Sequence, residues 1–495
     1  MNTLTLKKLE AQKAFASPNS VGLQRCIASI VFTFFIYLFL QIPFEGTMYE
    51  LYNYYTTIAL AGYFWIFLIN AKSVNHKVNL FLIYVAITIP FYFGGQILIM
   101  LGYGHQLSEE NYSLVDNRIP MQYHVEAMKY IILCLQMLNI GYLVTGGNSK
   151  GSTLFNDQKK YNYKAINRVA TILLIVSFVP TMARLIYDIV MAQVLGHLGL
   201  MHAKSEEEYL GIWNIFTYIK GWFLPACLMK IACGTYKGKK IGYLFLLLYC
   251  VLYLFSGSRY EIIQVAFAVM VLYSYSSVKK IKKKKFIIIG LIAYLGLVIL
   301  RSVSYTRDET GSGVSLESII DVIGGGVFYE SFFETSTTFT SVSNLLRYCP
   351  NTLPYNDGMS IVGGLIYILP DFLRPELIEH IVLHISAELS PYYYGFEGAG
   401  YGSAFVTEAF FNFGYFALFY VFIIGIILRK LTDTISFSIL YNNRIGLLVC
   451  TYIMTEMIWA IRSDMYLIPR HFVYYMLLPL FFSRIFRPRK VNSIR

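Results

Sequence analysis

Apolar residues in this chain fall into long continuous blocks, unlike the interrupted apolar pattern that a soluble core produces. A transmembrane helix needs roughly 20 mainly apolar residues, and most of these blocks approach that length. They predict helices at residues 26–44, 53–70, 79–101, 125–145, 169–194, 211–232, 241–256, 261–278, 286–300, 404–428, 446–461 and 467–486. The predicted fold class is therefore an all-α polytopic integral membrane protein with about 12 transmembrane helices.

One long stretch separates the ninth predicted helix from the tenth and divides the chain into three parts. Residues 1–300 hold helices one to nine, residues 301–403 form one large folded extracytoplasmic loop, and residues 404–495 hold the last three helices and the tail. Within the loop we expect helical pieces over 316–346, broken at three consecutive glycines. An apolar run at 361–369 is too short to cross a bilayer and predicts an interfacial helix.

Charge is sparse and is sorted along the chain. Of the 495 residues, 56% are hydrophobic and 14% are charged, whereas a soluble domain carries roughly 25% charged residues. Most of the 41 lysines and arginines fall in alternate loops, including a run at 279–285. The positive-inside rule then places both termini in the cytoplasm and the large loop outside the cytoplasmic membrane. The net charge of +12 follows from this sorting and does not predict nucleic-acid binding.

Few residues are spaced for disulfide, nucleotide or metal chemistry. All of the 7 cysteines except Cys349 lie in or beside predicted helices. No P-loop or Gly-rich dinucleotide fingerprint is present, and the cytoplasmic loops are too short for a nucleotide-sugar domain. His380, His384 and Glu388 share one helical face, but a second carboxylate is missing from this zinc-like spacing. We therefore predict no metal and no cofactor, and a substrate that is membrane-borne or external.

Five arginines and no lysine mark three predicted connections on the outer face. Arg259 follows a Ser-Gly-Ser turn between the seventh and eighth helices, Arg301 and Arg307 begin the large loop, and Arg462 and Arg470 flank the last outer connection. A guanidinium binds phosphate through two parallel hydrogen bonds and stays charged, so this set suits a pyrophosphate ligand. The simpler interpretation is snorkelling at helix ends or pairing with nearby carboxylates.

Glu408 lies just inside the outer end of the tenth predicted helix, where an isolated carboxylate is costly. It is either a general base made stronger by desolvation or the partner of an arginine. Glu456, in the eleventh helix, is interpreted as a packing partner. Tyr393 belongs to an aromatic, glycine-rich run at 391–402 that either stacks on sugar rings or forms part of an interfacial belt. The weaker candidates for the site are Glu330, Glu334, Asp464 and Tyr393.

Three features, in this order, resemble the oligosaccharide repeat-unit polymerases, the Wzy-type O-antigen and capsular polysaccharide polymerases. They are Gly257-Ser258-Arg259 after a mid-chain helix, the loop series Glu330, Glu334, Tyr355-Asn356-Asp357-Gly358 and Ile368-Leu369-Pro370, and the segment from Gly402 to Gly414. The resemblance spans residues 253–464, and the first half of the chain matches in hydropathy alone.

This resemblance implies a glycosyltransferase that joins undecaprenyl-pyrophosphate-linked oligosaccharides by inverting, metal-independent transfer at the outer face of the membrane. The growing glycan is the donor, and a hydroxyl of a new lipid-linked unit is the acceptor. Arg259 and the other outer arginines would offset the charge on the leaving pyrophosphate, and Glu408 would accept the acceptor's proton. The expected partners are membrane lipids and the flippase and chain-length regulator of the same pathway.

Two other functions stay open at this point. The ligase relatives of the family have a similar layout but transfer a finished glycan to a different acceptor. A transporter or flippase of lipid-linked sugars would carry charged residues deep in its spans. The few residues of that kind here are Lys129, Arg184, Asp188 and Lys220.

Overall fold

The computed structural model describes residues 19–44, 46–71, 79–102, 119–145, 162–207, 216, 218–255, 260–276, 332, 335–369 and 403–485. Within these ranges the chain is helical and contains no strand. Contacts between its parts divide the chain into two compact units. Unit 1 comprises Met1–Ser152, Phe328–Ser436 and Met457–Tyr466, and unit 2 comprises Thr153–Val327, Phe437–Glu456 and Leu467–Arg495.

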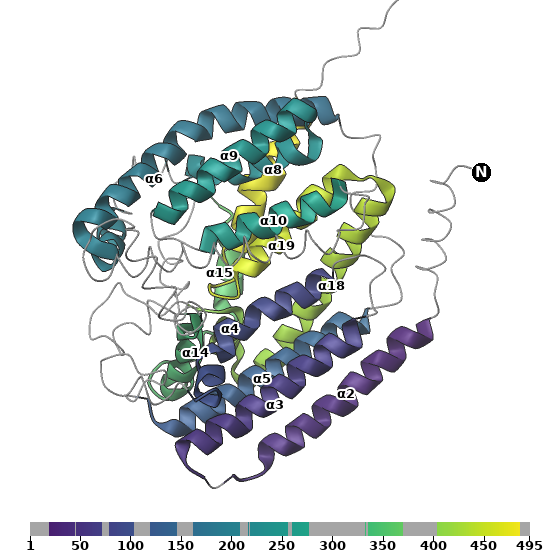
Figure 1. Cartoon of the computed structure of the whole chain (residues 1–495), viewed down its shortest axis with the longest axis vertical. Coiled ribbons are helices and arrows are strands. Elements are labelled where there is room, and N and C mark those ends of the chain that lie inside the picture. The colour runs from purple at the N-terminus through teal and green to yellow at the C-terminus, as the bar shows by residue number, and fades with distance from the viewer. Residues whose placement is uncertain are drawn as a thin grey trace, which may run out of the picture. The chain divides into compact units, whose positions relative to one another are not determined.

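Unit 1 begins with four long helices. They are α2 (Asn19–Gln41), α3 (Met48–Asn70), α4 (Leu80–Met100) and α5 (Met121–Val144). Figure 1 shows α2, α3 and α5 running alongside one another, and α2 and α3 both pack against α5. With 23 or 24 residues each, these three helices are roughly 35 Å long, which exceeds the hydrocarbon thickness of a bilayer.

The later segments of unit 1 are shorter, apart from the last. They are α14 (Thr337–Tyr348), α15 (Met359–Ile366), α17 (Phe405–Phe413), the single 3₁₀ turn η6 (Gly414–Phe416) and α18 (Ala417–Tyr441), whose final residues belong to unit 2. α14 packs against α4, α5 and α17, and α15 packs against α17. The described part of the predicted loop therefore packs on the helices of unit 1.

α5 and α18 approach each other closely through glycines. A Cβ atom on Gly141 would overlap the backbone carbonyl of Phe422, and one on Gly425 would overlap that of Leu138. Small residues let two helix backbones approach, and the resulting van der Waals packing drives association where lipid gives no hydrophobic force. Glycine at both positions is therefore required by this crossing.

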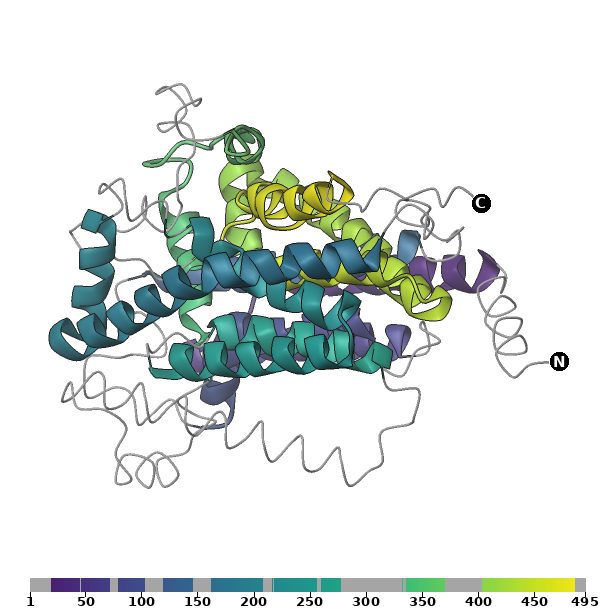
Figure 2. The same cartoon turned by 90° about the horizontal axis from the view of Figure 1, so that it is seen from above.

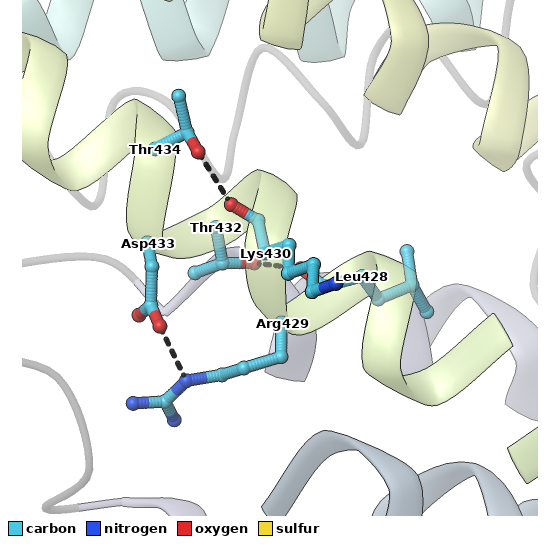
Figure 3. Close-up of polar contacts among 6 residues, drawn as sticks. All are labelled: Leu428, Arg429, Lys430, Thr432, Asp433 and Thr434. Carbon is cyan, nitrogen blue, oxygen red and sulfur yellow. Dashed lines mark hydrogen bonds and ion pairs between the residues drawn. The ribbon is translucent and has the colours of Figure 1, made fainter. Parts of the chain in front are cut away.

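Two residues of α18, Arg429 and Asp433, form an ion pair within this helix. Arg429 Nε lies 2.9 Å from Asp433 Oδ2, and the guanidinium lies over the ring of Tyr142, 5.0 Å from its centroid. Figure 3 shows this pair beside Thr432 and Thr434, whose hydroxyls donate to carbonyls four residues earlier. Charged side chains in a membrane helix are costly unless they are paired. The contacts of Arg429 and Asp433 explain how an apolar helix accommodates both charges.

Unit 2 is built around α6, a long helix that packs against α8 and α9 (Figures 1 and 2). Its elements are α6 (Tyr163–Glu207), α8 (Phe223–Cys233), α9 (Tyr236–Phe255), α10 (Tyr260–Ser276), α19 (Arg444–Trp459), α20 (Ile468–His471), the π-helix η7 (Phe472–Leu477) and α21 (Leu478–Ile485). The last residues of α19 belong to unit 1. α21 returns to pack against α6, so the C-terminal elements complete this unit.

Five described helical stretches are long and apolar enough to cross a membrane. They are Gly22–Gln41, Leu80–Met100, Met121–Val144, Tyr163–Met191 and Phe405–Ile439. On α2, large apolar side chains such as Leu23, Phe34 and Phe39 are exposed, as expected for a surface that faces lipid. The described part of the chain is therefore all-helical, and its apolar helices are those of a multi-pass membrane protein.

The predicted helix positions overlap described helices, except for 286–300, which lies outside the described residues. The run at 361–369 is confirmed as a short helix, α15. The predicted span 404–428 is not continuous: Gly414 has φ 55°, and a Cβ there would lie 3.0 Å from the Tyr355 ring. The twelve crossings, their orientation and the three-part division of the chain stay predictions.

Candidate active site

The predicted site residues fall into three groups. Arg259, Arg301, Arg307, Glu330, Glu334 and Tyr393 lie outside the described residues, as do His380, His384 and Glu388. Glu408, Arg462 and Asp464 belong to unit 1, and Arg470 belongs to unit 2. Among the described residues, no group of three or more His, Cys, Asp or Glu side chains is placed to hold a metal ion. The described site therefore consists of one cluster in each unit.

The unit 1 cluster centres on Glu408, in the first turn of α17. Its side chain is fully buried, with 1% of the residue exposed. Ser360 Oγ donates to Glu408 Oε1 at 2.8 Å, and the backbone N–H of Met465 donates to Oε2 at 2.5 Å. Asn412, one turn further along α17, donates to Ser360 Oγ at 2.6 Å and to the Glu408 carbonyl at 2.8 Å. Both carboxylate oxygens are therefore engaged by donors from other segments.

These hydrogen bonds join α15, α17 and the connection that follows α19. The backbone N–H of Phe405 donates to the Ala460 carbonyl at 2.8 Å, so the start of α17 is tied to this connection as well. Tyr92 OH, on α4, donates to the carbonyl of Ile461 at 3.3 Å. Gly364 of α15 lies so close to the backbone of Tyr466 that a Cβ would overlap its carbonyl. Glu408 thus lies where several segments of unit 1 converge.

Asp464 lies within electrostatic reach of Glu408, and it is buried with 3% exposed. Two predicted site carboxylates are therefore brought together, a result that a separation of 56 positions in the chain does not predict. Two buried negative charges repel each other, and fixed hydrogen-bond donors reduce that cost. In the described part of the chain, Glu408 forms no ion pair with an arginine. Ser360 and Met465 supply the hydrogen bonds that an arginine would supply in one of the two alternatives for Glu408.

The unit 2 cluster contains Arg470, held by an aromatic residue. Arg470 Nη2 donates to Tyr218 OH, and its guanidinium lies 4.9 Å from the centroid of the Tyr218 ring. Trp222 Nε1 donates to the Tyr474 carbonyl at 3.2 Å, so the segment before α8 is fixed against the start of the last helix. These contacts orient the guanidinium of Arg470, the one predicted arginine described in this unit.

The residue after Arg470, His471, pairs with Glu456, and the sequence does not predict this pair. His471 Nδ1 lies 3.0 Å from Glu456 Oε2, and their side chains are 27% and 9% exposed. The sequence predicts only a packing role for Glu456 in its helix. No spacing rule connects positions 456 and 471, because they lie in different helices.

The charged residues that a transporter would need have local partners in the structure. Arg184 Nε lies 3.1 Å from Asp188 Oδ1, one turn along α6. Lys220 Nζ lies 5.4 Å from the Tyr253 ring centroid, and in unit 1 Lys129 Nζ lies 5.5 Å from that of Tyr55. Aromatic faces and an adjacent carboxylate stabilise these charges inside an apolar helical protein.

Fold and clusters together define a helical, multi-pass membrane protein with buried carboxylates and an arginine fixed on a tyrosine. The family model for the O-antigen polysaccharide polymerase Wzy matches residues 26–488, which is nearly the whole chain. The chain belongs to this family. Comparisons with curated proteins and with solved structures each found no match. Its role is that of a glycosyltransferase-type polymerase acting on lipid-linked oligosaccharides in a membrane.

Proposed function

We propose that this protein joins undecaprenyl-pyrophosphate-linked oligosaccharide repeat units into a polysaccharide at the outer face of the cytoplasmic membrane. The observation that carries the proposal is the family match over residues 26–488 of a multi-pass helical chain. Transfer is inverting and needs no metal. The hydroxyl of one lipid-linked unit attacks the anomeric carbon of the growing glycan, and undecaprenyl pyrophosphate leaves.

The outer arginines are proposed to bind the pyrophosphate. Arg470 supports this role because its guanidinium is held by Tyr218 through a hydrogen bond and by the ring face. An arginine oriented in advance offsets developing negative charge without reorganising at the moment of reaction. Arg259, Arg301, Arg307 and Arg462 complete the proposed set, and Arg259 is also proposed to act in catalysis.

The general-base role of Glu408 stays a prediction. A base must come within hydrogen-bond reach of the acceptor hydroxyl, and Glu408 is buried with donors on both oxygens. The same contacts support a positioning role, in which the carboxylate fixes α15, α17 and the connection after α19. Asp464 belongs to the same cluster and shares this proposed role.

The direct test is polymerisation by purified protein. Lipid-linked repeat units extracted from source cells that lack this gene are incubated with the protein in detergent or nanodiscs. A ladder of products spaced by one repeat unit is the expected result, and it should persist in EDTA. NMR of the product should show that the anomeric configuration of the donor linkage is inverted. Transfer of the glycan once, to an acceptor other than a lipid-linked repeat unit, would identify a ligase. Movement of the lipid-linked units across a vesicle membrane, with no polymer formed, would identify a transporter.

The proposed orientation is tested separately. On intact spheroplasts, a membrane-impermeant reagent should not reach a tag at Arg495. The same reagent should reach a tag in the large loop. Co-purification tests the proposed association with the flippase and chain-length regulator, and polymerisation by the isolated protein does not depend on that association.

A further inference from the structure

Glu456 and His471 form a carboxylate–imidazole pair that the proposed function does not yet use. Glu456 lies on α19, His471 ends α20, and their side chains meet at 3.0 Å between Oε2 and Nδ1. Ionisable groups inside a membrane protein are costly and usually functional. Here the carboxylate is nearly buried, whereas the imidazole keeps 27% of its side chain exposed. The exposed member of the pair is therefore the one that a substrate can approach.

The pair sits at an irregular point of the last helix. The helix is regular up to His471, changes to a π-helix over Phe472–Leu477, and becomes α-helical again at Leu478. Single π-helical turns inside α-helices are uncommon and are frequently found at functional sites. The insertion changes the direction of the side chains that follow, relative to Arg470 and His471.

Aromatic residues surround both His471 and the preceding residue, Arg470. The rings of His471 and Tyr475 lie 5.5 Å apart between centroids. Tyr475 in turn packs so closely on Gly221 that a Cβ at position 221 would overlap the phenol ring. Because Arg470 is anchored on Tyr218 three residues before Gly221, the same short segment supports both functional side chains. Arg470 and His471 are successive residues of one unit, and each side chain is fixed by its own partners.

The hydrogen bond also sets the tautomer of His471. A carboxylate can only accept a hydrogen bond, so Nδ1 carries the hydrogen and Nε2 carries the lone pair. In this arrangement the carboxylate lies on the side of the ring opposite to the nitrogen that would take up the proton. A carboxylate that orients a histidine in this way is a recurring arrangement for general-base catalysis.

We propose that His471, oriented by Glu456, is the general base that deprotonates the acceptor hydroxyl in the polymerisation reaction. This inference rests on the proposed function and adds a catalytic residue to it. As the acceptor oxygen bonds to the anomeric carbon, its proton moves to His471 Nε2, and the bond between that carbon and the pyrophosphate oxygen breaks. Arg470 faces the leaving pyrophosphate, and the imidazolium then releases its proton to water. Glu456 is a positioning residue, because it acts through the imidazole.

The first test measures turnover of the full chain in nanodiscs, with lipid-linked repeat units extracted from source cells that lack this gene. His471→Gln keeps a polar side chain of similar reach and should lower kcat by about 10²- to 10⁴-fold, with KM little changed. Glu456→Gln should lower kcat by at least ~10-fold, because the tautomer and ring orientation are no longer fixed. The double variant should lose little more than His471→Gln alone, because the two side chains act as one unit.

Chemical rescue separates catalysis from structure. Added imidazole should restore part of the activity of His471→Ala, because it can fill the vacated space and accept the proton. The control is His124→Ala, which removes a buried histidine of unit 1 that contacts Ser343. Imidazole should not change the activity of that variant. A purely structural role for His471 predicts no rescue in either variant.

The outcomes separate this inference from the proposed function. If the wild type makes a ladder and folded His471→Gln keeps half or more of its turnover, the base assignment is wrong and the polymerase function stands. If His471→Gln does not fold, Glu456→Gln decides, and wild-type turnover by that variant would overturn the pair's role. If the wild type makes no polymer from the extracted units, the proposed function is wrong and the base assignment falls with it.

Discussion

Replacing Glu408 tests whether the buried carboxylate holds unit 1 together or carries a proton. Two changes differ in what they leave behind. Glu408→Gln keeps the size of the side chain and one acceptor oxygen. Glu408→Ala removes both oxygens and leaves the hydroxyl of Ser360 and the N–H of Met465 without their present acceptor.

The expected destabilisation follows from these two hydrogen bonds. A buried donor that loses its acceptor costs about 1–3 kcal/mol, so Glu408→Ala should lower the free energy of unfolding by about 2–6 kcal/mol. Glu408→Gln should cost about 1–3 kcal/mol, because the new amide can accept from only one of the two donors. Relief of repulsion with Asp464 opposes both losses and places the measured values toward the lower ends of these ranges.

Thermal unfolding in detergent and polymerisation in nanodiscs give the two readouts. We expect the melting temperature to fall in the order wild type, Glu408→Gln, Glu408→Ala, while the folded Gln variant polymerises at nearly the normal rate. Glu50→Gln is a matched control, because Glu50 is an exposed carboxylate that accepts hydrogen bonds from Thr47 in a helix cap. It should change the melting temperature much less.

The opposite pattern would refute this reasoning. If Glu408→Gln melts at the wild-type temperature and polymerises on the order of 100-fold more slowly, the carboxylate is the base that the sequence predicts. The hydrogen bonds from Ser360 and Met465 would then contribute little to stability. The hydroxyl of the acceptor sugar would also have to reach the Glu408 side chain, which is buried here.

Three further predictions concern other parts of the molecule. Burial raises the pKa of Cys349 from 9.0 to about 12. The fraction of thiolate then falls about a thousandfold, so a maleimide should label Cys349 slowly. A cysteine at the exposed position of Asn351, introduced as Asn351→Cys in a Cys349→Ser background, should be labelled quickly, and equal labelling rates would contradict the burial of Cys349. Asp433→Asn leaves Arg429 without its carboxylate and should lower the free energy of unfolding by about 3 kcal/mol in thermal melts, whereas an unchanged melting temperature would show that the pair is dispensable. Arg470→Lys keeps the positive charge but loses the planar guanidinium that can donate two parallel hydrogen bonds, so KM for the lipid-linked donor should rise at least ~10-fold. Full activity of this variant would exclude the proposed pyrophosphate contact.

The positions of the helices could be predicted from the sequence because burial in lipid imposes a local requirement. Each span must be continuously apolar, and a segment such as 125–145 shows this without reference to its neighbours. The short run at 361–369 was recognised in the same way, because its length alone excludes a crossing. The expectation of no nucleotide chemistry is equally local, because a missing fingerprint is a property of the chain itself.

The sequence also marked where chemistry was to be expected, but not how it is arranged. Glu408 was selected because a carboxylate in an apolar helix needs an explanation. Its partners come from positions 360 and 465, which are linked to it only by the way α15 and α17 pack. An arginine partner, which was one of the two alternatives for Glu408, would satisfy the same local requirement as the observed donors, so the helix sequence cannot distinguish them.

What the sequence by itself determined is the class of this protein: a multi-pass helical membrane protein with the motif order of a polysaccharide polymerase. Tertiary structure alone decided that Glu408 and Asp464 are close, that Gly414 divides a predicted span, and that Glu456 and His471 lie within hydrogen-bond distance. The physical reason is the separation along the chain over which each interaction acts. Hydropathy and helix length act between residues close in the chain, whereas a hydrogen bond between helices depends on where two distant backbones cross.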